Sequence, residues 1–379
     1  MPSSSPSRVS VSQLKPRLLL GPGPSPVSGR VLRALAHPTL GHLDPQFLTL
    51  LDDVSLRLRG IFGTGNEATL AVSGTGSAGM QAALANLLQP GDTAIVGIHG
   101  YFGGRMAEMA RRLGAGVVAV EAEWGRVLEP ERLIDAHRAH PRARLLSVVH
   151  AETSTGVRQP IREVGAYLSG TETLFVVDAV TSLGGIPVGV DAVGIDVCYS
   201  ATQKCLGAPP GLAPISLSSR AVDVVRRRKV PVSSWYLDVG LLMDYLGAGH
   251  VYHHTASSNL FFALHEALQE IEEEGLEARH DRHRRVGARL RLELGARGFT
   301  LFGDPGHQLP ELTSVRLPDG ADAVRLRHAL LERYGIEVGG GLGPTGASVW
   351  RIGLMGNGAS EASVERLVGA VDELGIGSV

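Results

Sequence analysis

The chain has 379 residues, 44% of them hydrophobic and 20% charged, which is typical of a folded protein with two or three domains. Its 36 Lys and Arg residues nearly balance its 38 Asp and Glu residues, so the net charge of −2 gives no general attraction to nucleic acid or to anionic membranes. Two cysteines exclude a disulfide framework, and no apolar run approaches the ~20 residues of a membrane helix. We therefore expect a cytoplasmic protein whose affinity comes from a defined site.

Residues 1–17 are rich in Ser and Pro and lack the apolar core of a signal peptide, so we expect a flexible N-terminal tail. From residue 69 to 218, seven short β-rich segments alternate with helical ones, including helices expected from Ser77 to Leu88 and after Gly103. The segments are T-L-A-V, T-A-I-V-G-I, G-V-V-A-V, A-R-L-L-S-V-V-H, T-L-F-V-V-D-A-V, D-V-C-Y-S-A and P-I-S-L-S. This order predicts an α/β fold with a mostly parallel seven-stranded sheet covered by helices on both faces.

A long helical pattern follows Ser257 and stops near Gly275, where its apolar residues recur at helical spacing. We interpret it as a bridge between domains. Residues 276–379 then read as helix, strand, helix, strand and helix, which predicts a small C-terminal α+β domain. Residues 18–275 would form the large domain.

The segment G-T-G-S-A-G, residues 74–79, follows an expected strand and opens a helix, as a dinucleotide-binding fingerprint does. The acid that should follow about 20 residues later is missing, because that region reads A-I-V-G-I-H-G. The hydroxyls and N–H groups of Thr75, Gly76 and Ser77 would still lie at a helix N-terminus, which favours a phosphate. An ordinary helix cap is the alternative for these residues alone.

Two further residues extend this pattern. Asp178 ends the segment F-V-V-D, and Lys204 ends Y-S-A-T-Q-K about 25 residues later, so both are expected at strand ends on one edge of the sheet. A lysine amine can bond covalently to an aldehyde, and an aspartate can keep a pyridine nitrogen protonated. Together with a phosphate cup, these are the requirements of pyridoxal 5′-phosphate (PLP).

Beyond these residues, the chain resembles the class V, fold type I aminotransferases that use PLP, specifically the alanine–glyoxylate and serine–glyoxylate (serine–pyruvate) group. The matching segments are L-L-G-P-G-P-S (19–25), S-G-T-G-S (73–77), H-A-E-T-S-T-G-V-R-Q-P (150–160), V-D-A-V-T-S-L-G-G (177–185), S-A-T-Q-K-C-L-G-A-P-P-G (200–211), Y-H-H-T (252–255), G-G-L-G (340–343) and W-R-I-G-L-M-G (350–356). The resemblance covers the chain apart from its first ~17 residues.

The resemblance implies catalytic roles for Lys204, which would hold the cofactor and move a proton, and for Asp178, which would pair with the ring nitrogen. The implied cofactor-binding residues also include Thr75, Gly76, Ser77, Phe102, Thr153, Val180 and Gln203, with Tyr252 and Thr255 reaching the cofactor of a neighbouring subunit. It therefore implies a homodimer with shared sites. Arg351, at the end of the strand W-R-I-G-L, would bind the substrate carboxylate, and Gly23 would lie against the substrate. Phe102 and Ser77 stand where some relatives have Trp and His.

The implied reaction moves an amino group from alanine or serine to glyoxylate or pyruvate. Transamination of 2-aminoethylphosphonate or ureidoglycine is an alternative on the same fold. A cysteine desulfurase-type lyase needs a nucleophilic cysteine in the second half, and no cysteine follows Cys205. We expect Cys205 to pack rather than react, no metal site at His150 and Glu152, and a solvated helix face for the basic run from Arg279 to Arg291.

Overall fold

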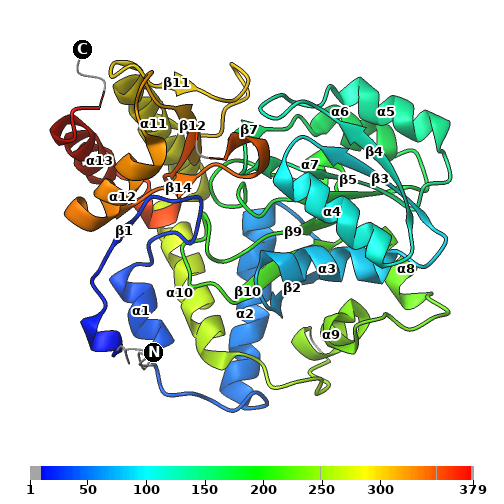
Figure 1. The fold of residues 1–379 in the computed structure, drawn as a ribbon. Coiled ribbons are helices and arrows are strands. Elements are labelled where there is room, and N and C mark those ends of the chain that lie inside the picture. The colour runs from blue at the N-terminus through cyan, green and yellow to red at the C-terminus, as the bar shows by residue number, and fades with distance from the viewer. Residues whose placement is uncertain (1–9, 248, 347, 377–379) are drawn as a thin grey trace, which may run out of the picture.

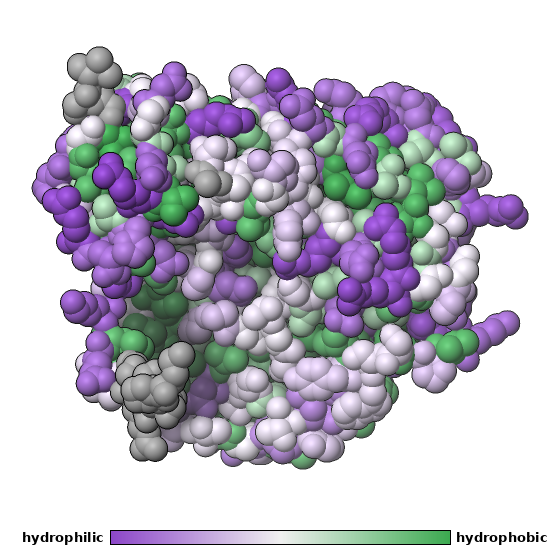
Figure 2. All heavy atoms as spheres, viewed as in Figure 1, coloured by the Kyte–Doolittle hydropathy of each residue, from purple (hydrophilic) through white to green (hydrophobic). Residues whose placement is uncertain are grey.

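A computed structural model of the chain describes residues 10–247, 249–346 and 348–376. Of the expected tail, residues 1–9 lie outside the described residues, and Val11–Gln13 forms a short exposed 3-10 helix, η1. Within the described ranges, no helix is both long and apolar enough to cross a bilayer. Hydrophilic and hydrophobic residues alternate over the face shown in Figure 2 without forming a band of either kind.

The elements are as follows. The α-helices are α1 Gly29–Leu35, α2 Pro45–Phe62, α3 Gly76–Leu87, α4 Tyr101–Arg112, α5 Pro130–Ala139, α6 Arg162–Leu168, α7 Val190–Val193, α8 Ser219–Arg226, α9 Val239–Leu246, α10 Ser258–Glu274, α11 Leu276–Gly295, α12 Ala323–Tyr334 and α13 Glu361–Glu373. The strands are β1 Leu18–Leu19, β2 Ala68–Ser73, β3 Thr93–Ile98, β4 Gly116–Glu121, β5 Leu145–Val149, β6 Ala151–Glu152, β7 Val157–Arg158, β8 Leu174–Asp178, β9 Val197–Tyr199, β10 Leu212–Leu217, β11 Thr300–Leu301, β12 Leu312–Arg316, β13 Ile336–Glu337, β14 Gly339–Gly340 and β15 Val349–Gly353. Further 3-10 helices are η2 Trp235–Leu237, η3 Gly343–Thr345 and η4 Gly356–Gly358.

The main sheet has seven strands in the order β2-β10-β9-β8-β5-β3-β4. Strand β10 runs antiparallel to both of its neighbours, and the other neighbouring pairs are parallel. Each of the seven β-rich segments of the sequence contributes one of these strands, so the predicted α/β fold with a mostly parallel sheet is confirmed.

Helices cover both faces of this sheet. Helices α3 and α4 pack together on one face, and α5 and α6 pack together on the other (Figure 1). The central strands β5 and β8 are buried along their whole length, which explains why their sequences, L-L-S-V-V and L-F-V-V-D, are apolar without alternation. The carboxyl ends of these strands form the edge where such sheets bind ligands.

Local sequence signals set the ends of several helices. Helix α2 begins after Asp44, whose side chain accepts a hydrogen bond from the Gln46 N–H, and it has Pro45 in its first turn. It ends at Gly63, which adopts the left-handed conformation at φ +68° that glycine tolerates best. Asp178 sits at a strand end for a similarly local reason, since the apolar run that makes β8 stops there.

The C-terminal part has its own sheet and core. Its four strands lie in the antiparallel order β11-β12-β15-β14, and α11, α12 and α13 pack around a core that contains Trp350. The N-terminal strand β1 pairs with β13, and Leu20 belongs to the same core, so this short segment is built into the C-terminal unit (Figure 1). The domain boundaries expected from the sequence, 18–275 for the large domain and 276–379 for the small one, remain a prediction.

Helix α10 is the long helix expected after Ser257. It packs against α1 and α2 and leads at Gly275 into α11, in the C-terminal unit (Figure 1). Gly275 has φ +81°, a conformation that glycine adopts readily, and this lets the chain change direction between α10 and α11 within a single residue. This arrangement fits the interpretation of α10 as a connection between the two parts.

Candidate active site

A cavity of about 160 Å³ lies at the carboxyl edge of the main sheet, beside the first turn of α3. It brings together most residues expected from the sequence, namely Thr75, Gly76, Ser77, Phe102, Thr153, Asp178, Val180, Gln203 and Lys204. Its remaining lining consists of Met80, Arg105, Val149, Ala151 and Thr181. Residues from five separate parts of the chain therefore meet at the edge where a parallel sheet binds its ligand.

Asp178 ends β8, as predicted, and its side chain is buried in the cavity wall. Its Oδ1 accepts a hydrogen bond from the Val180 N–H at 2.8 Å, and its Oδ2 accepts one from the Tyr199 hydroxyl at 2.9 Å. Burial raises the pKa of Asp178 to about 7, against the opposing effect of these two hydrogen bonds. A cation against this carboxylate would restore its charge, and a protonated pyridine nitrogen is such a cation.

Lys204 does not lie at a strand end, as the sequence suggested. Strand β9 ends at Tyr199, and Lys204 lies in the turn that follows. The turn forms because the Thr202 hydroxyl donates to the Pro209 carbonyl at 2.6 Å and the Ala208 N–H donates to the Thr202 carbonyl at 3.1 Å. The chain thus leaves the sheet before Lys204 and returns to it as β10. The turn between the two strands carries the Lys204 amine beyond the edge of the sheet.

The amine of Lys204 meets the N-terminal segment of the chain. Its Nζ donates a hydrogen bond to the Pro22 carbonyl, and a Cβ atom on Gly23 would lie only 2.6 Å from it. Gly23 also has φ +113°, so two independent constraints require glycine there. Burial, with the nearby charge of Arg351, lowers the pKa of Lys204 to about 8, which makes part of the amine neutral near physiological pH.

The turn that carries Lys204 is supported from behind by a residue that we expected on a solvated face. Arg279, on α11, is only 2% exposed; its Nη2 donates to the Cys205 carbonyl at 2.8 Å and its Nη1 pairs with Glu274 at 2.7 Å. The prediction for this basic run was wrong at Arg279 and at the fully buried His283, because this face of α11 packs inward: Arg279 donates to the Cys205 carbonyl, and His283 accepts a hydrogen bond from the Gly356 N–H at 3.1 Å. Cys205 is buried, as expected of a packing residue, and burial raises the pKa of its thiol.

Residues 75–77, which are expected to bind a phosphate, lie at the N-terminus of α3. Thr75 is the N-cap residue, and its hydroxyl makes no capping bond to the helix. A side chain at Gly76 would meet Val180 at 3.0 Å and Ala201 at 3.1 Å, so the close packing of α3 on the sheet edge requires glycine. The amide oxygen of Gln203 is buried and has no hydrogen-bond partner among the described residues. The uncommitted Thr75 hydroxyl, the helix N–H groups and the helix dipole therefore meet at this end of the cavity.

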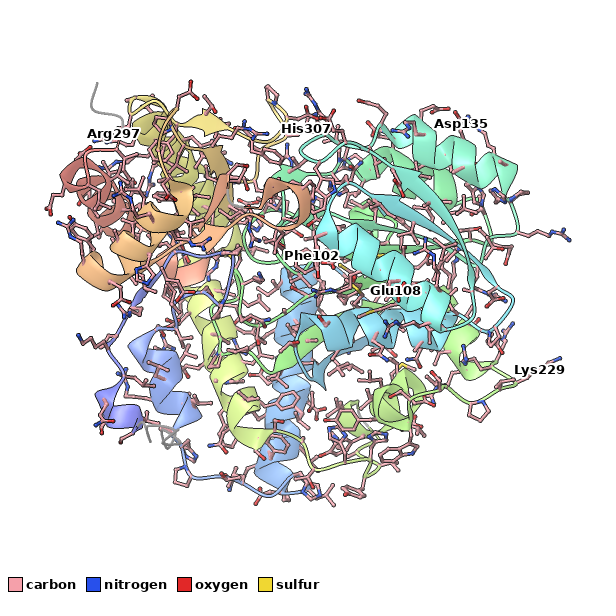
Figure 3. The ribbon with its side chains drawn as sticks, in the orientation of Figure 1. Phe102, Glu108, Asp135, Lys229, Arg297 and His307 are labelled. Carbon is pink, nitrogen blue, oxygen red and sulfur yellow. The ribbon has the colours of Figure 1, made fainter. Side chains whose placement is uncertain are left out.

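Phe102 belongs to the first turn of α4, because this helix begins at Tyr101 rather than after Gly103 as predicted. Glu152 explains the earlier start: its carboxylate accepts hydrogen bonds from the Phe102 N–H at 3.1 Å and the Gly103 N–H at 3.4 Å. Figure 3 shows Phe102 at the inner end of α4, with Glu108 farther along the same helix. Sequence reasoning missed this role of Glu152, which is fully buried.

Arg351 lies in the middle of β15, not at the end of a strand, since β12 and β14 pair with β15 on either side. Its Nε donates to the Gly340 carbonyl at 2.7 Å, and its Nη1 donates to the carbonyl of Thr153, a cavity residue, at 3.1 Å. Burial lowers the pKa of Arg351 to about 10, and Glu152 opposes this shift. The guanidinium thus faces the cavity wall as a cation.

Tyr252 and Thr255 lie outside this cavity, and both side chains are exposed, Tyr252 by 57%. The Tyr252 ring packs at 5.1 Å from that of His42, and Thr255 lines a shallow hollow with residues 39–42. The structure therefore does not bring them to the site of their own chain.

The residues present fit PLP. Asp178 would hold the ring nitrogen, Lys204 the aldehyde carbon, and the α3 N-terminus the phosphate, while Val180 and Phe102 line the cavity between these points. The glycines at 23 and 76 leave open the space that side chains would fill. Gln203 lines the same cavity as Thr75, Gly76 and Ser77, and the NH2 group of its amide is a donor of the kind that a phosphate oxygen accepts.

Comparison with known proteins gives the family. The profile described as aminotransferase class-V matches residues 30–367. The chain belongs to the class V aminotransferase family. An alanine–glyoxylate aminotransferase from Drosophila melanogaster is 40% identical over 362 residues, which cover 94% of this chain and 92% of the fly protein. An (S)-ureidoglycine–glyoxylate transaminase from Bacillus subtilis is 37% identical over 359 residues, which cover 90% and 86%.

The solved structures agree with this family. The crystal structure of an alanine–glyoxylate aminotransferase from Nostoc sp. superimposes with a TM-score of 0.94 at 45% identity and covers 97% of both chains. The resemblance inferred from the sequence motifs is therefore confirmed, as is the fold type I architecture. This class V aminotransferase is thus matched over nearly its whole length.

Proposed function

We propose that the protein is a PLP-dependent aminotransferase that moves an amino group from alanine or serine to glyoxylate or pyruvate. The observation that carries this proposal is the single cavity in which Lys204, Asp178 and the α3 N-terminus meet, with Arg351 bonded to its wall at Thr153. PLP, when bound, supplies an electron sink for the carbanion at the substrate Cα. The relatives of nearly equal length support the same reaction class.

Lys204, Asp178 and Arg351 would each have a separate role in this reaction, set by their positions in the site. Lys204 would hold the cofactor through its Nζ, and once the substrate amine had taken its place, the same Nζ would accept the proton from the substrate Cα and deliver it to the cofactor carbon. A pKa of about 8 suits a group that must both accept and release a proton near neutrality. Asp178 keeps the ring nitrogen protonated, and Arg351 binds the substrate carboxylate through two parallel hydrogen bonds.

Close packing favours a small acceptor. Gly23 lies against the Lys204 amine, and a side chain at Gly339 would collide with the ring of Pro22, so the main chain packs closely beside this amine. We expect higher kcat/KM for glyoxylate or pyruvate than for 2-oxoglutarate. Steady-state assays with each acceptor at saturating alanine test this expectation, and a highest kcat/KM for 2-oxoglutarate would overturn it.

A second amino donor has a specific observation in its favour. The Bacillus subtilis relative named for ureidoglycine and glyoxylate is 37% identical, close to the 40% of the fly protein. A half-reaction screen would mix the holoenzyme with alanine, serine, (S)-ureidoglycine or 2-aminoethylphosphonate and follow the visible cofactor absorbance. The donor that bleaches it fastest identifies the physiological class. Bleaching by none of these donors would contradict the proposal.

We further propose a homodimer with shared sites, in which Tyr252 and Thr255 reach the phosphate of the neighbouring subunit. Their exposure and their distance from the cavity of their own chain support this. Lys204→Ala chains mixed with Tyr252→Phe/Thr255→Ala chains should regain about a quarter of wild-type activity after subunit exchange, since one site per heterodimer is intact. No recovery in a sample shown to exchange subunits would assign both residues to their own chain.

A further inference from the structure

One cation in the cavity has no role in the function proposed above. Arg105, in the second turn of α4, lines the cavity together with Thr75, Gly76 and Ser77. Its Nη1 donates a hydrogen bond to the Ser77 hydroxyl at 3.1 Å, so the guanidinium lies directly beside the first turn of α3. The charge is therefore at the phosphate end of the cavity, not at the end that holds Asp178.

Aromatic rings hold this guanidinium in place. Its Cζ lies 4.9 Å from the centre of the Phe102 ring and 5.1 Å from that of Tyr101. Among the described residues it forms no ion pair, whereas Arg112, on the same helix, pairs with Glu108 at 2.8 Å. Arg105 thus keeps an uncompensated charge and several N–H donors for another partner.

A phosphate monoester needs such a partner. It carries close to two negative charges near pH 7, because its second pKa is about 6. The other donors at this end are neutral, namely the hydroxyls of Thr75 and Ser77, the helix N–H groups and the Gln203 amide. A multiply charged group in a partly enclosed site is costly to desolvate unless a cation pairs with it.

We propose that Arg105 is a cofactor-binding residue of this enzyme, whose guanidinium pairs with the phosphate dianion of PLP. The inference rests on the proposed PLP-dependent function and adds a charged partner to the neutral donors of α3. Stacking of Arg105 against Phe102 links the two contacts, since two successive turns of α4 would cover the cofactor ring and neutralise its phosphate. Positioning by aromatic rings also reduces the conformational entropy lost on binding.

The test compares PLP with pyridoxal, which has the same ring and aldehyde but no phosphate. Cofactor-free protein is titrated with each compound, and the visible absorbance that develops at Lys204 gives two dissociation constants. The variants are Arg105→Gln, which removes the charge, and Arg105→Lys, which keeps it without the planar fork. Arg112→Gln is the matched control, as an exposed arginine of the same helix. Far-ultraviolet circular dichroism and thermal unfolding check that each variant folds.

We expect Arg105→Gln to weaken PLP binding about 10- to 100-fold, the effect of losing a charged hydrogen bond. Pyridoxal binding should change less than about 3-fold, and Arg105→Lys should lie between wild type and Arg105→Gln for PLP. Equal losses for both compounds, or no loss for PLP, would overturn the role of Arg105. If Arg105→Gln does not fold, Arg105→Lys decides by the same ratio. Wild-type protein that develops no absorbance with PLP would instead overturn the proposed function itself.

Discussion

On the side of the main sheet, the cavity holds two ionisable groups whose pKa values burial moves toward neutrality, to about 7 for Asp178 and about 8 for Lys204. On the side of the C-terminal unit, Arg351 stays a cation, since its pKa falls only to about 10. The sheet wall therefore carries groups that can exchange protons, and the C-terminal wall carries a permanent charge. This division suits a reaction in which one wall performs chemistry and the other only binds a carboxylate.

Glu152 lies between the two walls and affects both. Its buried carboxylate opposes the fall in the pKa of Arg351 and of Lys204, and it adds to the rise in that of Asp178. It also caps the helix that carries Phe102. Substitutions at either wall, or at Glu152, should therefore affect proton transfer and carboxylate binding to different extents.

Removing the amine from the sheet wall should have the largest effect. Lys204→Ala should lower kcat by at least about 1,000-fold, because both the covalent attachment and the proton transfer at Nζ are lost. The variant should bind PLP without the absorbance of the covalent form. Lys229→Ala is the control, as an exposed lysine far from the cavity (Figure 3). A Lys204→Ala enzyme with turnover near that of wild type would refute the assignment.

Neutralising the other sheet-wall group should have the next largest effect. Asp178→Asn should lower kcat about 100-fold, since the ring nitrogen loses the carboxylate that keeps it protonated. Stopped-flow measurement of the first half-reaction checks this, with Asp135→Asn on the exposed surface as the control (Figure 3). Unchanged rates with bound cofactor would contradict the role of Asp178.

The same substitution should stabilise the cofactor-free protein. The pKa of Asp178 is about 7 in the folded protein and near the ordinary 3.8 in the unfolded chain, so the stability of the wild type falls between these pH values and then levels off. Asp178→Asn escapes this loss. The free energy of unfolding of Asp178→Asn should exceed that of the wild type by up to about 4 kcal/mol at pH 8. This difference in stability should shrink toward pH 4. Urea unfolding at several pH values measures it; a constant difference would argue against the buried carboxyl as its source.

At the C-terminal wall, a substitution should affect substrate binding and leave cofactor attachment intact. Arg351→Lys should lower kcat/KM by roughly 10- to 100-fold for amino acid and 2-oxo acid alike, because lysine cannot form the bidentate pair. The visible spectrum of the holoenzyme should not change. Arg316→Lys, on the neighbouring strand β12, provides the control. If the spectrum changed as much as KM, the separation of the two walls would be wrong.

The smallest effect is expected at Glu152. Glu152→Gln removes a negative charge that raises the pKa of Lys204, so this pKa should fall below about 8. The rate of PLP attachment, which requires the neutral amine, should then reach its plateau at lower pH than in wild type. Stopped-flow attachment rates from pH 6 to 9 measure the shift, with the exposed Glu163→Gln as the control. A shift to higher pH would show that Glu152 acts on Lys204 in another way.

The sequence predicted the parts of the site that depend on local order. The position of Asp178 at the end of β8 follows from the apolar run before it, and the position of residues 75–77 at a helix start follows from their glycine and hydroxyl residues. The sequence placed Lys204 less well, because the end of β9 depends on the hydrogen bonds of the turn at 202–209. Local propensity carries no information about these bonds.

Side chains brought together from distant segments were decided by the tertiary structure. Arg279 reads as part of a basic helix face, and only the packing of α11 against the Lys204 turn makes it a buried support. Glu152 and Arg105 gain their partners only when β6, α3 and α4 meet at one edge of the sheet. Thus the order of the apolar segments determined the sheet and the residues at its edge, while the charges around that edge depend on contacts between elements far apart in the chain, where burial and non-local hydrogen bonds set each group's environment.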